Sequence, residues 1–340
     1  MTLVISETGK PITAPVGIRS VELEITGTCQ LNCTHCCTSS SPKTGPGAMT
    51  REDWQQVIAD VAALGISTAQ LIGGEPTFSP YLPHYIAQAI DAGLKVEVYS
   101  NLTHIRPALW AALSRPGARL ATSYYSDQPE EHEKVTKGKG SHARTRANII
   151  AALARGIPLR VGIVEVFDGQ RVKEAEAELR ALGVRLINID KARPIGRAAT
   201  PDGNGPTTAD LCGHCFRHRV SVDPDGNVSG CILSRFIDAG NVRQQRLIEI
   251  LNSDRWEEIT ATIPMPRAAC TPDDSNDCDP ASTEACDPAY EEEEFAPTAA
   301  NGACPPADSS DCNPASTPAC LPSFPKLGTA TAPTTLEATA

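Results

Sequence analysis

The chain has 340 residues, 41 % of them hydrophobic, which is enough for one large domain with a sizeable core and a smaller second one. Its formal net charge of −11 argues against broad nucleic-acid binding, because a phosphate backbone needs a basic surface. No apolar run approaches the roughly 18 residues of a membrane-spanning helix, and the start of the chain lacks the features of a signal peptide. We therefore expect no membrane partner and a cytoplasmic location.

Six apolar, β-rich runs alternate with amphipathic helical patterns over residues 18–200. Two helix starts are marked, one by Thr50 with Asp53 three residues on, and one by Ser141 before an apolar run. Such repetition predicts an α/β fold with parallel strands and crossover helices, as an incomplete barrel or an open sheet. The expected strands lie at about 21–26, 69–72, 95–99, 119–123, 159–165 and 185–189.

The pattern changes near Arg197 to a linker rich in proline and glycine, followed by a compact segment. There, residues 220–222 and 227–229 flank the turn DPDG and predict a hairpin. A helical pattern follows from about 243 to 262. The domains expected from these shifts are an N-terminal segment 1–17, a strand–helix domain 18–200, a small domain 201–265 and a tail 266–340.

The tail is acidic and rich in cysteine, and it contains an internal repeat. DCDPASTEAC recurs as DCNPASTPAC, so the repeated cysteines are Cys270, Cys278 and Cys286, then Cys304, Cys312 and Cys320. We expect partial disorder here, because the tail cannot form a large hydrophobic core. Metal ligation, adventitious disulfides and partner binding remain open roles for it.

The 13 cysteines indicate metal or redox ligands, because the chain carries no export signal. Cys29, Cys33 and Cys36 lie in CQLNCTHC, directly after the first expected strand. Three thiolates can hold three irons of a four-iron cluster and leave the fourth iron open to a ligand. Zinc or free thiols are the alternative, with His35 as a spare zinc ligand, but structural zinc usually takes four protein ligands.

A second motif, Gly73-Gly74-Glu75-Pro76, follows the second expected strand. Its glycines let a backbone approach a ligand closely, although the motif alone could be an ordinary turn. In folds of this kind the chemistry lies at the carboxyl ends of the strands. The position of both motifs therefore favours a functional role.

Together, CQLNCTHC and GGEP resemble the motifs of the radical S-adenosylmethionine (radical SAM) superfamily, over residues about 20–200. The resemblance implies a partial (β/α)6 TIM-like barrel and a [4Fe-4S] cluster on Cys29, Cys33 and Cys36. The open iron would chelate the amino and carboxylate groups of S-adenosylmethionine, and GGEP would contact the methionine amino group. His35 takes a position that is commonly aromatic and packs near the adenine.

Polar residues after later strands match further contacts of that family. Ser100 and Asn101 lie where the ribose is commonly bound, and Ser123 with Arg144 resembles a carboxylate-binding pair. The fork of an arginine suits a carboxylate. Helix capping or plain surface exposure are the alternatives for each of them.

A second cysteine set begins like a zinc ribbon, with Cys212, Cys215 and Cys231, but Ser234 stands where a fourth cysteine would complete it. The set instead resembles the cluster-binding extension known as SPASM, or its shorter twitch form. This resemblance implies an auxiliary [4Fe-4S] cluster, with Cys270 as the candidate fourth ligand.

The two resemblances imply an enzyme that reductively cleaves S-adenosylmethionine to a 5′-deoxyadenosyl radical and removes hydrogen from an unactivated C–H bond. We expect a ribosomally made peptide as substrate, by cross-linking, epimerisation or oxidation, and a flavodoxin or ferredoxin as electron donor. A small natural product, such as a sugar or aminocyclitol, is the alternative, because the short segment before the first strand leaves no room for a leader-binding domain. A non-enzymatic zinc or iron–sulfur scaffold is a third hypothesis.

Overall fold

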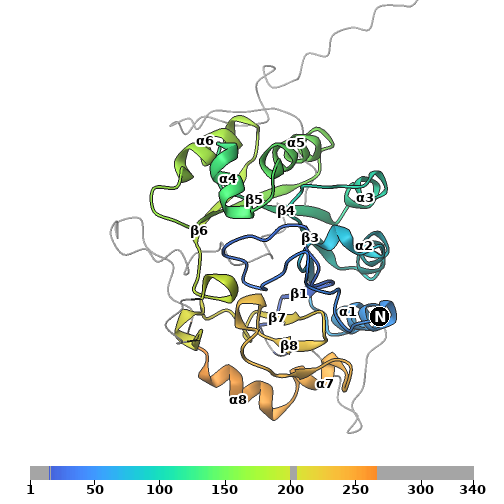
Figure 1. Ribbon diagram of the computed structural model, residues 1–340. Coiled ribbons are helices and arrows are strands. Elements are labelled where there is room, and N and C mark those ends of the chain that lie inside the picture. Colours follow the sequence, from blue (N-terminus) through green and yellow to red (C-terminus); the bar gives the residue numbers. More distant parts are fainter. Residues whose placement is uncertain (1–14, 16, 200–204, 266–340) are drawn as a thin grey trace, which may run out of the picture. The chain divides into compact units, whose positions relative to one another are not determined.

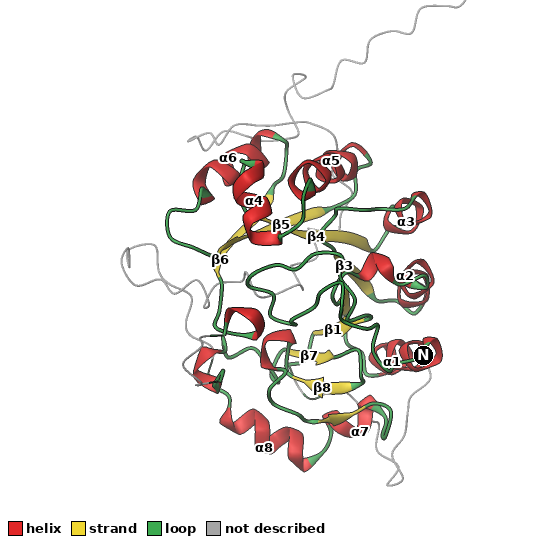
Figure 2. Cartoon of the chain, viewed as in Figure 1, coloured by secondary structure: helices red, strands yellow, loops and turns green. Residues whose placement is uncertain are grey.

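The computed structural model describes residues 15, 17–199 and 205–265. In this part of the chain the strands form one nine-stranded sheet in the order β6-β5-β4-β3-β2-β1-β7-β8-β9, which Figure 2 shows in yellow. All neighbours from β6 to β7 are parallel, and β8 and β9 are added antiparallel. The strands are β1 (Ser20–Glu24), β2 (Thr68–Ile72), β3 (Lys95–Tyr99), β4 (Ala118–Tyr124), β5 (Leu159–Glu165), β6 (Leu186–Lys191), β7 (Arg219–Val222), β8 (Asn227–Ser229) and β9 (Gly240–Asn241).

Helices cover one side of this sheet. Figure 1 shows α1, α2, α3 and α5 along its outer side, with the blue loop that follows β1 on the inner side. No described helix is both long and apolar enough to span a bilayer. The helices are α1 (Arg51–Ala63), α2 (Leu82–Asp91), α3 (Pro107–Leu113), α4 (Pro129–Thr136), α5 (Ser141–Ala154), α6 (Val172–Ala181), α7 (Leu247–Leu251) and α8 (Asp254–Thr262).

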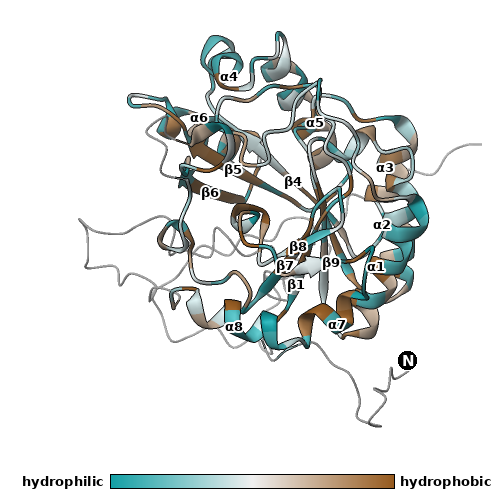
Figure 3. Ribbon diagram, turned by 60° about the horizontal axis from the view of Figure 1, so that its bottom comes forward, coloured by the Kyte–Doolittle hydropathy of each residue, from teal (hydrophilic) through white to brown (hydrophobic). Residues whose placement is uncertain are grey.

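The two faces of the sheet differ in polarity. Successive residues of a strand point to opposite faces, so a strand that alternates apolar and polar residues has one apolar and one polar face. In β1, Val21 and Leu23 belong to the hydrophobic core, whereas Glu22 and Glu24 alternate with them and are also buried. Figure 3 shows the hydrophobic character of β5 and β6 in brown. The inner face, to which Glu22 and Glu24 point, therefore carries buried polar groups, and such groups are needed where a polar ligand binds.

The α/β fold with a partial barrel of six parallel strands is confirmed, and each expected strand is present within two residues of its predicted position. Thr50 caps α1 in a full capping box with Asp53. Ser141 does begin α5, but it is not the cap, since Gly140 takes that position. The Ser141 hydroxyl instead shares a hydrogen bond of 2.7 Å with Thr136.

The helical pattern over 243–262 forms two helices, α7 and α8, rather than one. Ser253 accounts for the break, because its hydroxyl accepts a hydrogen bond from the Trp256 N–H (3.3 Å) and starts a new helix. Trp256 is buried against Phe216, with ring centroids 4.8 Å apart. The break thus lets α8 pack onto the second cysteine region.

The predicted hairpin is present as β7 and β8, and it extends the main sheet, since β7 pairs in parallel with β1 from Ser20↔Arg219 to Leu23↔Val222. The small domain expected at 201–265 therefore shares its sheet with the strand–helix domain. The domain boundaries stay a prediction, and the calls on segments 1–14 and 266–340 lie outside the described residues.

A buried ion cluster ties three strands together on the inner face. Glu97 of β3 receives two hydrogen bonds from Arg160 of β5 (2.8 and 2.7 Å) and an ion pair from Arg119 of β4 (2.6 Å). Burial alone would raise the pKa of Glu97, but the two arginines outweigh it and lower the pKa to about 2. Glu97 is therefore ionised at any physiological pH.

Glu97→Gln should lower the free energy of unfolding by about 3–5 kcal/mol, because it leaves two buried guanidinium groups without their shared carboxylate. Urea denaturation measures this loss, and Thr50→Ala, which removes only a helix cap, should cost about 1 kcal/mol. In the parent, the contribution of Glu97 is present above pH 4.5 and is lost as the pH falls towards 2. A Glu97→Gln protein as stable as the Thr50→Ala protein would contradict this account.

Candidate functional site

A cavity of about 310 Å³ lies on the inner, polar face of the sheet. It collects side chains and backbone from the carboxyl ends of the strands and from the region around β7 and β8. Both predicted sets of cysteine ligands reach it. Among the residues that line it are Cys29, Cys33, His35, Cys36, Gly73, Gly74, Asn101, Ser123, Cys212 and Cys231.

The loop that carries the first three cysteines is held by backbone hydrogen bonds to its surroundings. The Cys29 N–H donates to the Ser41 carbonyl (3.3 Å), and the Thr34 N–H donates to the Val135 carbonyl at the end of α4 (2.9 Å). Within the loop, the Cys36 N–H donates to the Cys33 carbonyl (3.3 Å). The loop has no helix or strand of its own, so these contacts fix its path.

Cys29, Cys33 and Cys36 are free thiols in or beside the cavity wall. Burial raises the pKa of Cys29 and of Cys33 to about 12, so both thiols are neutral until a metal displaces their protons. Hydrogen bonds already reach two of the sulfurs, from Asn101 Nδ2 to Cys29 (3.8 Å) and between Thr38 and Cys36 (3.3 Å). Such bonds are typical of thiolate ligands of iron–sulfur clusters.

Among the described residues, no three His, Cys, Asp or Glu side chains are grouped as the ligands of a single metal ion would be. A four-iron cluster does not require such a group, because each thiolate binds a different iron. The donor set of three thiols on one loop beside a cavity therefore fits a cluster better than a four-ligand zinc ion.

Gly73 and Gly74 pack against the loop at its root. The Gly74 N–H donates to the Thr26 carbonyl (2.7 Å), and a Cβ on Gly74 would lie 2.4 Å from the Thr28 carbonyl oxygen. Gly73 has a φ of +147°, and its Cβ would lie 2.4 Å from the Thr26 oxygen. These contacts show that the two glycines allow the chain leaving β1 to pass close to them, and the close approach of a ligand stays a prediction.

Glu75 lies behind the cavity wall. Its carboxylate accepts hydrogen bonds from the Ser100 hydroxyl (2.7 Å), the Asn101 N–H (2.8 Å) and the Thr77 N–H (3.1 Å). Burial raises its pKa, and these hydrogen bonds oppose the rise. Glu75, Pro76 and Ser100 are not among the lining residues, so they support the site from behind while Asn101 faces it.

Ser123 and Arg144 are not brought together. Ser123 lines the cavity and shares a hydrogen bond of 3.0 Å with the Tyr99 hydroxyl. Arg144 is exposed, does not line the cavity, and donates to the Lys139 carbonyl (2.9 Å). The reason is local, because Arg144 lies in the first turn of α5 and its side chain turns back onto the residues before the helix.

His35 lies in the cavity wall with its ring edge-on to Tyr125, at a centroid distance of 5.2 Å. Burial, and then the positive charge of Arg197, lower the pKa of His35 to about 4. Its imidazole is therefore neutral at pH 7. A neutral ring beside a tyrosine offers a flat surface, which is compatible with the aromatic role implied for this position.

The second cysteine set is compact and buried. The Cys215 thiol is hydrogen-bonded to both Cys212 and Cys231, and these contacts, followed by burial, raise its pKa well above the ordinary value. The structure thus brings together three cysteines that are separated by a hairpin in the sequence. Cys270, the predicted fourth ligand, lies outside the described residues.

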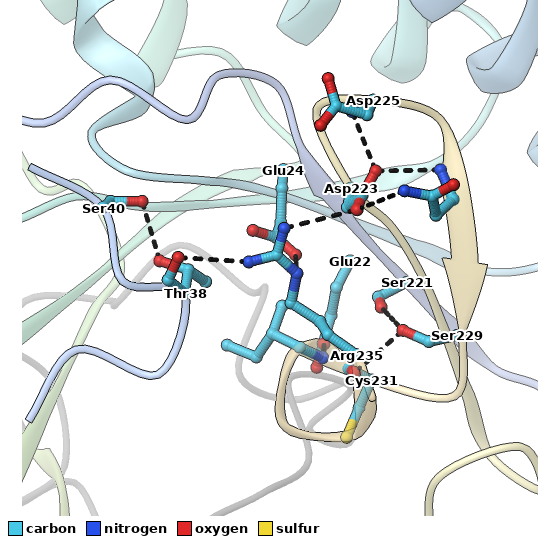
Figure 4. A network of polar contacts seen from close by, with 12 residues as sticks. Glu22, Glu24, Thr38, Ser40, Ser221, Asp223, Asp225, Ser229, Cys231 and Arg235 are labelled. Atoms are coloured by element: carbon cyan, nitrogen blue, oxygen red, sulfur yellow. Dashed lines mark hydrogen bonds and ion pairs between the residues drawn. The ribbon is translucent and has the colours of Figure 1, made fainter. Parts of the chain in front are cut away.

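Figure 4 shows a polar network between the two cysteine regions that the sequence did not reveal. Arg235 donates to the Thr38 carbonyl (3.3 Å) and pairs with Glu24 of β1 (3.3 Å) and with Asp223 of the hairpin turn (3.4 Å). Burial raises the pKa of Glu24 to about 8, although Arg235 opposes the rise. Arg235 thereby links the segment after Cys36 to the segment after Cys231.

Glu22, two residues earlier in β1, also holds the second region. Its carboxylate accepts a hydrogen bond from the Ile232 N–H (2.7 Å) and lies 3.7 Å from Arg219. Ile232 directly follows Cys231. Alternating glutamates in a buried strand were the available signal for both contacts, because a buried carboxylate needs partners.

Arg197 is a further residue that the sequence reading missed. Its side chain donates to the carbonyl oxygens of Cys33 and Ser40, both at 2.7 Å. The available signal was its place after the sixth strand, at the same end of the sheet as the other motifs. In the sequence, this point is marked only as the start of a linker rich in proline and glycine.

Comparisons with known proteins agree with this arrangement. The model of the radical SAM superfamily matches residues 23–182, and that of the SPASM iron–sulfur cluster-binding domain matches residues 212–279. The second match extends beyond the described residues. The two matches fall on the two cysteine regions that meet at the cavity.

Several curated proteins are similar in sequence. The AdoMet-dependent heme synthase of Methanosarcina barkeri is 26 % identical over 58 % of this chain and 57 % of its own length. The PqqA peptide cyclase of Ruegeria pomeroyi is 28 % identical over 66 % of this chain and 60 % of its own length. The chain thus spans about three fifths of the length of these relatives.

Two solved structures share the fold. Streptococcus suis SuiB bound to its precursor peptide SuiA has a TM-score of 0.62 at 11 % identity, over 73 % of this chain and 68 % of SuiB. The enzyme anSMEcpe with bound AdoMet and a peptide has a TM-score of 0.53 at 14 % identity, over 70 % of this chain and 81 % of its own. The chain thus carries a radical SAM domain over residues 23–182 and a SPASM iron–sulfur cluster-binding region over residues 212–279.

Proposed function

We propose that this protein modifies a ribosomally made peptide by radical chemistry that starts from S-adenosylmethionine. The single observation that carries the proposal is the cavity shared by the first cysteine loop and by Cys212 and Cys231. A substrate bound there lies between the two cysteine regions. Relatives named as a PqqA peptide cyclase, a sporulation killing factor maturation protein and a mycofactocin maturase, and the fold shared with SuiB, support a peptide substrate.

Cys29, Cys33 and Cys36 would hold the first [4Fe-4S] cluster, with Gly73 and Gly74 fixing the root of their loop. When bound, this cluster supplies the electron that breaks the C–S bond of S-adenosylmethionine, which yields methionine and the radical that takes hydrogen from the substrate. The protein must hold the loop, orient the ligand and keep water out.

The polar groups of the cavity wall suit the orienting role. Asn101 and Ser123 present an amide and a hydroxyl to the cavity, and His35 stays neutral because of its burial. We propose Asn101 and Ser123 as the contacts to the ribose and the carboxylate of S-adenosylmethionine. Arg144 stays a prediction in that role, and Arg193 and Arg197 are cations that do line the cavity.

Cys212, Cys215 and Cys231 would hold the auxiliary [4Fe-4S] cluster, with Cys270 as the fourth ligand. Arg235 and the two glutamates of β1 fix this region against the first loop. A cluster ligated only by the protein suits electron transfer, so its place beside the substrate fits an oxidative modification such as a cross-link. A flavodoxin or ferredoxin donor and a cytoplasmic location stay predictions.

A small-molecule substrate is the second candidate, because the heme synthase of M. barkeri is also a relative. Peptides encoded near the gene, and separately sugars or aminocyclitols, should be incubated with reduced enzyme and S-adenosylmethionine in deuterated water. We expect a mass change in a peptide. A change confined to a small molecule would replace the peptide proposal.

Cys33→Ala should bind less iron and form no detectable 5′-deoxyadenosine, because one iron of the first cluster loses its ligand. Anaerobic reconstitution, iron and sulfide analysis, and chromatography of the nucleoside product measure this. Cys37→Ala is the matched control, since Cys37 lies outside the ligand spacing, and it should retain both. Full nucleoside formation by Cys33→Ala would show that the first cluster has been misplaced.

Cys215→Ala should lose roughly half of the bound iron while it retains the 5′-deoxyadenosine formation of the first cluster. Formation of modified peptide should fall much further than nucleoside formation, because the auxiliary region faces the substrate. Comparing the two products in one reaction tests this. Equal losses of both products would indicate that the auxiliary region serves only to stabilise the fold.

A further inference from the structure

The segment Gly196-Arg197 lies directly on the first cysteine loop, although it follows β6 far along the chain. Gly196 has a φ of +63°, and a Cβ built on it would lie 2.3 Å from the Cys36 carbonyl oxygen and 2.4 Å from that of Cys37. Both the left-handed backbone and the close approach require glycine. The two backbones are therefore fitted to each other at the third cysteine.

Arg197 spans the same loop with three hydrogen bonds. Its backbone N–H donates to the Cys36 carbonyl (3.0 Å), its Nε donates to the Cys33 carbonyl, and its Nη2 donates to the Ser40 carbonyl, both at 2.7 Å. The rigid guanidinium fork holds two of these acceptors at a fixed separation, which a lysine ammonium cannot do. The side chain thus ties the Cys33 carbonyl to the Ser40 carbonyl, and the backbone N–H of the same residue holds the Cys36 carbonyl.

The charge of Arg197 is also placed beside the loop. Within residues 17–199 and 205–265, its side-chain partners are backbone carbonyls and none is a carboxylate. A partly buried cation is screened less than a surface one, so it acts on charges formed nearby. Its field favours thiolates over thiols, and it favours a cluster that has gained an electron over one that has not.

We propose that Arg197 is a positioning residue that holds the cysteine loop in its ligand geometry and raises the reduction potential of the cluster bound there. The inference rests on the proposed function, because it assumes a cluster on Cys29, Cys33 and Cys36. It adds a residue from the segment that follows β6 to a site whose motifs follow β1 and β2. The guanidinium fork is responsible for the position of the loop, and the positive charge is responsible for the higher reduction potential, so the two effects can be tested separately.

Arg197→Met removes both the fork and the charge, whereas Arg197→Lys keeps only the charge. Arg155→Met is the control, because Arg155 is an exposed cation at the C-terminal cap of α5, where it donates to the Ala151 carbonyl (2.8 Å) and lies over the Trp110 ring (4.6 Å). After anaerobic reconstitution, iron per chain and the midpoint potential are measured for each protein. The potential is read from the electron paramagnetic resonance signal that changes when S-adenosylmethionine is added, so the auxiliary cluster does not interfere.

We expect both Arg197 variants to bind less iron than the parent and the Arg155→Met control. In the loaded fraction, Arg197→Met should have a more negative potential, by at least about 59 mV, which is a tenfold shift of a one-electron equilibrium. Arg197→Lys should stay close to the parent potential. Gly196→Ala, which keeps the charge but displaces the segment, should lose iron in the same way.

Unchanged iron content and potential in Arg197→Met would overturn the inference. Equal potentials in all loaded variants would overturn its electrostatic half and leave Arg197 a support of the loop only. A parent protein without any signal that responds to S-adenosylmethionine would instead refute the proposed function. If Arg197→Met does not fold, the Arg197→Lys and Gly196→Ala proteins still test the loss of iron.

Discussion

The segment that leaves strand β1, residues 26–28, is packed backbone to backbone against Gly73 and Gly74, and the rest of the site depends on this contact. Any side chain at either glycine would lie 2.4 Å from a carbonyl oxygen of Thr26 or Thr28. Cys29 follows this segment directly, so its position is set by the backbone contacts that residues 26–28 make with the chain after β2. The same contact places Glu75 where it can bind the backbone and hydroxyl that follow β3.

Strand β1 also joins the two cysteine regions. On one side it pairs with β2, and on the other with β7, so the second cysteine region is built onto the same sheet. Its buried Glu22 accepts a hydrogen bond from the Ile232 N–H, and its buried Glu24 pairs with Arg235. Arg235 in turn donates to the Thr38 carbonyl, in the segment after the first cysteine loop. A single strand thus sets the distance between the two cysteine regions, which would hold the two clusters under the proposed function.

The strand positions could be predicted because each apolar run is short and is bounded by a helix pattern or a turn. The capping box of Thr50 was readable for the same reason, since it depends only on residues three apart. The contacts of Arg197, Arg235 and Arg144 were not readable, because each depends on which carbonyl a long side chain meets after folding. Periodicity locates an element, but it does not show whether a residue such as Ser100 faces the cavity or supports it from behind.

Under the proposed function, two iron–sulfur clusters share one cavity on the inner face of the sheet. An iron anomalous difference map, from crystals of the anaerobically reconstituted protein with S-adenosylmethionine, tests it most directly. The account predicts two groups of iron peaks, one beside Cys29, Cys33 and Cys36 and one beside Cys212, Cys215 and Cys231, with S-adenosylmethionine bound at the first. A zinc signal at the second set, or no iron at the first, would contradict it.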